Sequence, residues 1–144
     1  MSFVDGFSDQ LKKELKDYAP KNPFETYEYY QCLENSGCAS ENSGWQPNHN
    51  LQTSVDGNLI IPIYKKTNSY GEFIFDYSWA NAFARYGIEY YPKLVSSVPF
   101  TPCHSSKLIG NNELLVDAIT EVENFMSSEG IQSCLLYTSP SPRD

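Results

Sequence analysis

The sequence predicts one domain of the α/β (α+β) class, with a small mixed sheet flanked by helices. Segments with the apolar spacing of helices alternate with short segments typical of strands, in the order α-α-β-β-β-α-β-α. No repeat, coiled coil or low-complexity block interrupts this order. The length of 144 residues, with or without the last eleven, is enough for one modest domain with its own hydrophobic core.

Two helices are expected near the N-terminus. The first begins at Ser8, whose hydroxyl is a suitable N-cap, and ends before Pro20. The second has Asn22 as its N-cap, Pro23 at the first helical position and Gly37 as its stop. Both segments carry apolar residues at helical rather than alternating spacing, so we expect both to pack one face on the core.

Three strands follow. Residues 45–55 and 59–67 read as a hairpin joined by a tight turn at Asp56–Gly57. Pro62 interrupts the second of these strands and indicates a bulge or an edge position, because proline donates no ladder hydrogen bond. A further strand is expected to begin at Gly71, where aromatic and acidic residues alternate.

The second half of the chain alternates helix, strand and helix. A helix capped by Ser78 is expected to close at Gly87, and residues 93–98 read as a strand. The longest helix is capped at Asn111 or Asn112. We expect its core face to consist of Leu114, Leu115, Ala118, Ile119, Val122, Phe125 and Met126.

The charge and hydropathy of the chain limit its partners. The formal net charge is -8 and no basic run is present, so we expect no nucleic-acid-binding patch. No apolar stretch approaches membrane-spanning length, and the N-terminus lacks the apolar core of a signal peptide. We therefore expect a cytoplasmic protein with no membrane segment; the oligomeric state stays open.

The cysteines and histidines do not form a recognisable metal motif. Cys32 and Cys38 are too far apart for a zinc knuckle, and neither His49 nor His104 completes one, so no metal is expected. Cys103 lies beside His104, but catalytic thiol and imidazole groups are usually distant in sequence, which favours a simple loop position. The 11 tyrosines, clustered as TYEYYQ and IEYYPKL, are more typical of packing at a half-wet surface than of chemistry.

The final residues, CLLYTSPSPRD, differ from everything before them. All of residues 134–144 match one reading frame of a transposase-type sequencing-library adapter, so we expect residues 1–133 to be the native part and 134–144 not to be. The alternative is a natural, disordered Ser/Pro-rich terminus. The long helix also ends where another strand is expected to follow, which agrees with a truncated chain.

Three blocks of the sequence resemble one protein family. They are NPFETYEYYQCLENSG, GWQPNHNL with GNLIIPIYKKTNSYGEFIFDYSWANAF, and GIEYYPKLVSSVPFTP. Together they resemble the FemAB-like family of peptidoglycan biosynthesis or recognition. The resemblance implies a partial GNAT-like acyltransferase fold, with acyl-CoA or aminoacyl-tRNA as the donor of the full-length protein. The donor loop is expected to lie beyond Ser133, which implies that this chain is inactive alone.

Candidate catalytic residues follow from the chemistry of amine acylation, which needs a base and donors for an oxyanion. Glu72 and Asp76 are four residues apart at the ends of one predicted strand, so we expect their carboxylates on the same face, where one could orient an amine. The alternative is that both are solvent-facing carboxylates. Trp45 and His49 are expected to pack around the first strand, with His49 hydrogen-bonded and structural.

Three further residues are candidates for substrate binding. Lys93 could hold a phosphate or carboxylate of the acceptor, although a surface lysine with its stem packed is an equal alternative. Thr101 lies in a rigid bend between two prolines, which either presents its hydroxyl to a ligand or is purely structural. Tyr64 is the third candidate for substrate binding.

Two functions are compatible with these observations. The first is a fragment of an N-acyl or aminoacyl transferase that modifies a small-molecule, peptide or glycan acceptor. The alternative is a non-catalytic module of the same fold that binds a glycan or peptide through a tyrosine-rich groove.

Overall fold

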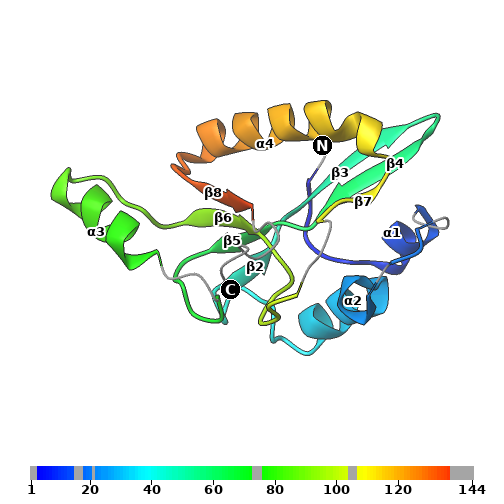
Figure 1. Cartoon of the computed structure of the whole chain (residues 1–144), viewed down its shortest axis with the longest axis horizontal. Helices are drawn as coiled ribbons and strands as arrows, with labels where there is room; N and C mark the ends of the chain where they lie inside the picture. Colours follow the sequence, from blue (N-terminus) through cyan, green and yellow to red (C-terminus); the bar gives the residue numbers. More distant parts are fainter. Residues whose placement is uncertain (1–2, 15–17, 21, 73–75, 104–106, 137–144) are drawn as a thin grey trace.

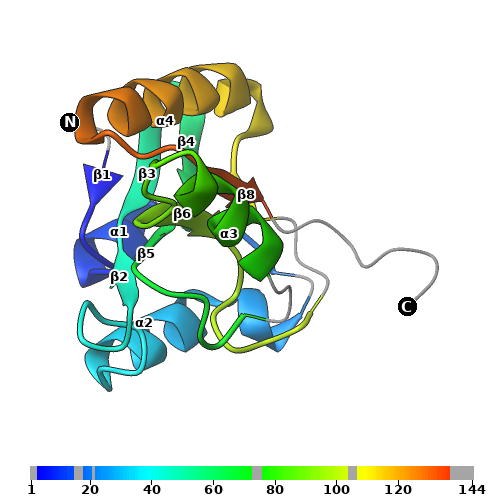
Figure 2. The same ribbon diagram turned by 90° about the vertical axis from the view of Figure 1, so that its left-hand side faces the viewer.

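The computed structural model describes residues 3–14, 18–20, 22–72, 76–103 and 107–136. Within these ranges, the chain forms four α-helices and two four-stranded sheets, which confirms the mixed α/β class. The long helix α4 covers one side of the sheets, α1 and α2 lie on the other side, and α3 projects at one end (Figures 1 and 2).

Each sheet is assembled from segments distant in sequence. The first has the strand order β1-β3-β4-β7, and all its pairs are antiparallel: β1 (Phe3–Val4), β3 (His49–Ser54), β4 (Gly57–Ile61) and β7 (Ile109–Gly110). The second has the order β2-β5-β6-β8: β2 (Trp45–Pro47), β5 (Tyr64–Lys66), β6 (Lys93–Ser96) and β8 (Cys134–Leu136). The two-residue strands β1 and β7 were not predicted, because they are too short to carry a pattern.

The predicted hairpin is present, but it bends between the two sheets. Its outer part, β3 with β4, belongs to the first sheet, and its inner part, β2 with β5, belongs to the second. The bend falls at Asn48 and at Pro62–Ile63, where the Asn48 N–H donates to the Ile63 carbonyl at 2.9 Å. Pro62 therefore marks a change of sheet rather than a bulge or an edge. The turn pairs Ser54 with Gly57, one residue earlier than predicted.

A helical crossover links the two parallel strands of the second sheet. After β6, the chain passes through β7 and a short 3-10 turn, and then enters α4 (Leu115–Glu129). Asn111 was predicted to cap the long helix, but it caps the 3-10 turn (Asn112–Leu114), and the N-cap of α4 is Leu114. Gly130 ends α4 with a φ of 68°. Strand β8 then pairs in parallel with β6. It occupies the position where a strand was expected to follow the helix, and its residues are the first three of segment 134–144.

The face that α4 presents to the sheets agrees with the prediction except at one position. Ala118 and Val122 are buried against β3 and β4, and the partly buried residues packed around them are Leu114, Leu115, Phe125 and Met126. Ile119 was expected in this core but is 43% exposed. It follows Ala118 directly and therefore points about 100° away from the centre of the apolar stripe.

The N-terminal helices begin where the sequence indicated, but the second is divided. Helix α1 (Asp9–Glu14) is capped by the Ser8 hydroxyl. Asn22 caps a 3-10 turn, Pro23–Glu25, rather than a continuous helix. Thr26 has an extended backbone and caps α2 (Tyr27–Asn35) through its hydroxyl. One predicted helix is thus two short elements, because Thr26 both ends the first and starts the second.

Helix α3 (Tyr77–Arg85) begins two residues earlier than predicted. Its N-cap is Asp76 rather than Ser78, and the Asp76 carboxylate makes no capping bond because it is bound elsewhere. All nine residues of α3 are described, and none of them is buried. Most of the strand predicted before it, residues 73–75, lies outside the described residues, and neither Glu72 nor Asp76 is in a strand.

The hydrophobic core has two parts, one on each face of the second sheet. One part joins Trp45, Tyr64 and Val95 with the aromatic side chains of α2. The other joins Ile63 and Leu94 with the buried face of α4. The buried tyrosines are Tyr27, Tyr30, Tyr64 and Tyr90, which agrees with the packing role predicted for the tyrosine clusters.

Candidate functional site

A row of three buried side chains crosses the second sheet. Trp45 on β2 pairs with Lys66 on β5, and Lys66 pairs with Lys93 on β6. Residues directly opposite one another in a sheet project their side chains from the same face, so these three are neighbours. Lys66 and Lys93 have no solvent exposure, and Trp45 has almost none. We call this set the lysine row.

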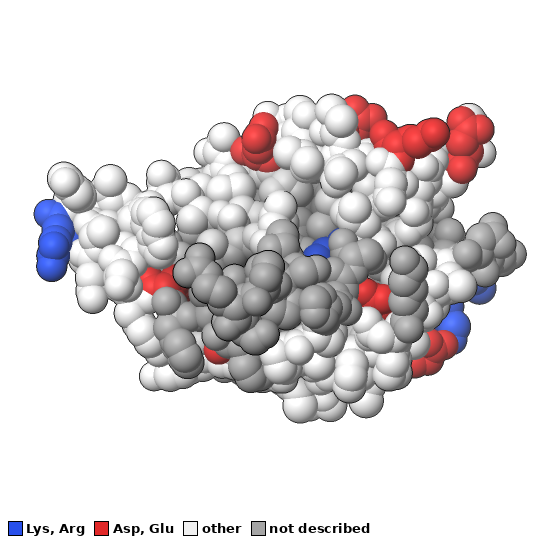
Figure 3. Space-filling model, in the orientation of Figure 1, with Lys and Arg blue, Asp and Glu red and all other residues white. Residues whose placement is uncertain are grey.

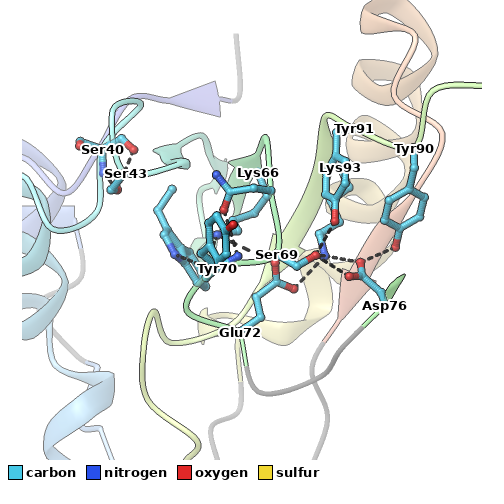
Figure 4. Close-up of polar contacts among 12 residues, drawn as sticks. Ser40, Ser43, Lys66, Ser69, Tyr70, Glu72, Asp76, Tyr90, Tyr91 and Lys93 are labelled. Carbon is cyan, nitrogen blue, oxygen red and sulfur yellow. Dashed lines mark hydrogen bonds and ion pairs between the residues drawn. The ribbon is translucent and has the colours of Figure 1, made fainter. Parts of the chain in front are cut away.

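Two like charges opposite each other destabilise a sheet unless counter-charges offset them. Here the segment that follows β5 supplies two carboxylates. The Lys93 ammonium donates to Glu72 Oε2 at 2.8 Å and to Asp76 Oδ2, and Figure 4 shows it between the two. Glu72 Oε1 lies 3.9 Å from the Lys66 ammonium. Two lysines and two carboxylates therefore form a buried cluster that is neutral overall.

Asp76 is the carboxylate of this cluster that also binds two hydroxyl groups. It accepts hydrogen bonds from the Ser69 hydroxyl and, at 2.6 Å, from the Tyr90 hydroxyl (Figure 4). Burial raises the pKa of Asp76, but the hydrogen bonds from Lys93, Ser69 and Tyr90 outweigh it, and the net pKa is lowered. Burial and the bond to Asp76 raise the pKa of Tyr90. The carboxylate is thus ionised and the phenol neutral at neutral pH.

Lys66 is bound more weakly than Lys93. Within the described ranges its ammonium donates to one acceptor, the Tyr70 carbonyl at 2.8 Å, and lies 3.8 Å from the centre of the Trp45 ring. The Trp45 indole donates to the same carbonyl at 3.1 Å. Burial lowers the pKa of Lys66 to about 8; Glu72 opposes this shift and Lys93 adds to it.

These positions decide between alternatives that the sequence left open. Glu72 and Asp76 are both buried, so the expectation of solvent-facing carboxylates is wrong. Both contact the Lys93 ammonium, although neither lies in a strand as predicted. Lys93 is buried too, so it is not a surface lysine, and the groups it holds belong to this chain. The reason is the pairing of Lys66 with Lys93, which demands two counter-charges.

Tyr64 belongs to a second polar group, centred on Glu34 at the C-terminal end of α2. Glu34 Oε1 accepts hydrogen bonds from His49 Nε2 at 2.7 Å and the Tyr64 hydroxyl at 3.2 Å. Glu34 Oε2 accepts from the Phe7 N–H at 2.7 Å. Burial raises the pKa of Tyr64 well above its usual value, and the Glu34 charge adds to this effect.

His49 has a defined role in this group. Its Nδ1 accepts a hydrogen bond from the Ile63 N–H at 3.0 Å, so the proton of the neutral ring is on Nε2, which faces Glu34. The ring is fully buried. The structure therefore agrees with the prediction that His49 is hydrogen-bonded and structural.

Glu34 also lines a surface pocket of about 630 Å³. Three further carboxylates line it, those of Asp5, Asp9 and Glu41, and none of the described lining residues is Lys or Arg. A pocket with this lining favours a cationic group such as an ammonium. Tyr64 does not line this pocket and is connected to it through Glu34.

Thr101 lies apart from the lysine row. Its hydroxyl donates to the Pro99 carbonyl at 3.0 Å and accepts from the Tyr29 hydroxyl at 2.8 Å, which ties the bend to α2. The neighbouring Phe100 packs against Trp45, with ring centres 5.2 Å apart. The bend therefore contacts the lysine row through Phe100, not through Thr101.

Four residues of these groups were missed by the sequence analysis: Glu34, Lys66, Ser69 and Tyr90. For Lys66 a signal existed, because a hairpin register and one further strand place it opposite Lys93. For Glu34 there was none, since its partners are 15 to 30 positions away in the chain.

Other features carry no site in the described part of the chain. No group of three or more His, Cys, Asp or Glu side chains there could hold a metal ion. Cys32, Cys38, Cys103 and Cys134 are free thiols, and His104 lies outside the described residues.

No described helix is long and apolar enough to cross a membrane. On the face drawn in Figure 3, acidic side chains gather near α4, and described basic side chains occur singly.

Comparison with known proteins gives one match. A FemAB-like family model, described as peptidoglycan biosynthesis/recognition, matches residues 8–142, nearly the whole chain. Among curated proteins and among solved structures, no match was found.

Proposed function

Since the chain belongs to the FemAB-like family of peptidoglycan biosynthesis or recognition, we propose that it serves N-acyl or aminoacyl transfer to an amine of a peptidoglycan peptide. In this reaction, the amine nitrogen attacks the acyl carbonyl and an N–C bond forms. The C–S bond of a thioester donor or the C–O bond of an aminoacyl ester breaks, and the amine loses a proton to a base. The donors, acyl-CoA or aminoacyl-tRNA, imply a cytoplasmic reaction.

The observation that carries this proposal is the carboxylate-lined pocket at Glu34. An acceptor amine is an ammonium before it reacts, and four carboxylates around one pocket attract it. Glu34 is held in place by the Phe7 N–H, His49 and Tyr64, so its position is fixed before any ligand enters. Tyr64 then acts on the substrate through Glu34, as a positioning residue.

In this proposal the lysine row positions residues 69–72 and Asp76. Glu72 and Asp76 bind the ammonium of Lys93, a group of this chain and not of a substrate. Their role is therefore to hold their own parts of the chain, on either side of residues 73–75, against Lys93 of β6, and they reach a substrate only if Lys93 releases them. Thr101, tied to Tyr29, holds the neighbouring bend.

The test is a binding titration with a peptidoglycan stem peptide that carries a free side-chain amine. We expect saturable binding that Glu34→Gln weakens about tenfold, because the substitution removes one carboxylate but keeps the side chain's shape. Glu123→Gln, an exposed change on α4, is the control and leaves binding intact. Binding that is indifferent to Glu34→Gln would contradict the proposal.

A recognition module is the second candidate, and one observation favours it. Helix α3 presents Tyr77 and Trp79 to solvent, 53% and 66% exposed, and its C-cap residue Tyr86 is 84% exposed. Exposed aromatic rings on a rigid element are suited to stacking on sugar rings. This candidate predicts binding of a glycan strand without its peptide and loss of that binding in Trp79→Ala. If Trp79→Ala leaves glycan binding unchanged, α3 is excluded as the recognition surface.

A further inference from the structure

A second surface pocket is lined by α1 and by the first turn of α2. Its volume is about 560 Å³, within the range of about 300–1,000 Å³ that is typical of ligand pockets. Four of its described lining residues give it an apolar surface: Tyr18, Pro20, Tyr27 and Ile109. Tyr27 and Ile109 are buried and belong to the hydrophobic core, so this surface is a firm one. We call this cavity the Tyr27 pocket.

The Tyr27 pocket meets the carboxylate-lined pocket at Glu34 (the Glu34 pocket) at Asp9, which lines both. Asp9 Oδ1 accepts a hydrogen bond from the Gln31 side-chain amide at 3.2 Å, and the same amide donates to the Tyr27 hydroxyl at 2.7 Å. The Tyr27 hydroxyl in turn donates to the Phe7 carbonyl at 3.1 Å. Gln31 and Phe7 line the Glu34 pocket, so these hydrogen bonds form the boundary between the two pockets. A ligand that passes over Asp9 therefore reaches both.

The two pockets differ in charge. Four carboxylates and no described Lys or Arg line the Glu34 pocket, whereas Lys12 and Lys13 of α1 line the Tyr27 pocket. The Lys12 ammonium is already paired with the carboxylate of Glu28, which lines the same pocket, at 2.6 Å. The exposed Lys13 has no ion pair or hydrogen bond with another described residue. Lys13 is therefore the cation that the Tyr27 pocket offers to an anionic group of a ligand.

We propose that the two pockets bind one acceptor peptide at both of its charged groups, the side-chain amine at Glu34 and the terminal carboxylate at Lys13. Asp9 and Lys13 are four residues apart on α1, roughly 6 Å along the helix axis, so they share a face and the charge changes sign within about one turn. The apolar side chain next to the carboxylate packs on Tyr27 and Ile109. This inference deepens the proposed function and rests on it, because the amine is the group to which the acyl chain is transferred.

The carboxylate subsite defines the class of peptide that is selected. A free terminal carboxylate is an anion, whereas the same carboxyl group in an amide bond is neutral. A peptide whose terminal carboxyl group is amidated, or joined to another chain through an amide, therefore loses the ion pair with Lys13. Its side-chain amine still fits the Glu34 pocket. The two pockets together thus favour peptides in which both groups are free over peptides already joined at the carboxyl end.

The experiment compares two synthetic stem peptides by calorimetry. Both have a free side-chain amine, but one ends in a carboxylate and the other in the corresponding amide. We expect the native protein to bind the carboxylate form about fivefold more tightly, the effect of one exposed ion pair. Lys13→Gln, an exposed change, removes this preference by weakening the carboxylate form alone. Lys65→Gln is the control: Lys65 lines neither pocket, so the preference stays.

Titration of Glu34→Gln with the same two peptides separates this inference from the proposed function. Equal affinity of the native protein for the two peptides, or a preference that persists in Lys13→Gln, overturns the inference. If Glu34→Gln weakens binding in that case, the proposed function stands without it. If the preference depends on Lys13 but Glu34→Gln binds as the native protein does, binding at both groups and the proposed function are wrong, and only a carboxylate site remains. Binding of neither peptide overturns both.

Discussion

The substitution Lys93→Met tests the physical basis of the buried cluster. Methionine keeps most of the volume of the lysine stem but removes the ammonium that two carboxylates share. Glu72 retains Lys66 at 3.9 Å, an attraction of about 4 kcal/mol at an effective dielectric constant of 20, before desolvation is counted. Asp76 retains only hydroxyl partners among the contacts described here. We therefore expect a loss of about 3–5 kcal/mol in the free energy of unfolding.

Lys65→Met is the matched control, since Lys65 precedes Lys66 and projects from the opposite face of β5. Its ammonium lies 3.2 Å from Glu129, and both side chains are partly exposed, at 26% and 45%. An exposed pair of this kind contributes at most about 1 kcal/mol. Urea unfolding followed by tryptophan fluorescence gives both values. If Lys93→Met lowers the free energy of unfolding by no more than Lys65→Met does, the cluster is not both buried and charged, and the reasoning is wrong.

The pH dependence of the Lys93→Met effect provides an independent check. In the native protein the Asp76 pKa is lowered, so its stabilisation is present above its ordinary pKa and is lost as the pH falls through the lowered value. Without Lys93, burial raises that pKa, and the buried carboxyl takes up a proton before the unfolded chain does. The destabilisation is therefore smaller at about pH 5 than at about pH 8. Equal destabilisation at both pH values would contradict this account.

Three further outcomes are expected. Because the Lys66 pKa is lowered to about 8 in the folded protein, the unfolded chain binds more protons than the folded one above that pH. The free energy of unfolding, measured relative to that of Lys66→Met, therefore rises by about 2 kcal/mol between pH 8 and about pH 10. A difference that does not change with pH would refute the lowered Lys66 pKa. Tyr64→Phe removes a hydrogen bond to the Glu34 carboxylate and costs about 1.5 kcal/mol in the same unfolding assay; no cost would mean the bond is absent. Gly71→Ala destabilises by at least about 1 kcal/mol more than Gly37→Ala, because both have a positive φ but only the first meets Phe100.

The sequence predicted the elements better than their assembly. The hairpin, the capped helices and the long crossover helix follow from local signals such as the Ser8 cap and the apolar face of α4. The bend that divides the hairpin between two sheets was only hinted at by Pro62. Whether a proline marks a bulge, an edge or a change of sheet depends on what packs on each face, and that is a property of the assembled chain.

The candidate site shows the same limit. Glu72 and Asp76 were chosen as catalytic candidates and Lys93 as a substrate-binding candidate, and their burial in one cluster depends on the register of β5 with β6. The Ser78 cap was wrong because Asp76 is fixed by Lys93 and Tyr90, a tertiary interaction that overrides the local capping preference. Glu34 could not be found from sequence, because its role depends on Phe7, His49 and Tyr64 meeting in space.

The most direct test of the proposed function compares two forms of one stem peptide, with a free side-chain amine and with the same amine acylated. A protein that serves transfer to this amine must distinguish acceptor from product, whereas a recognition module need not. Measured by calorimetry, we expect the free-amine peptide to bind at least about tenfold more tightly, because acylation removes the charge that the Glu34 pocket attracts. Equal affinity for the two peptides would contradict the account.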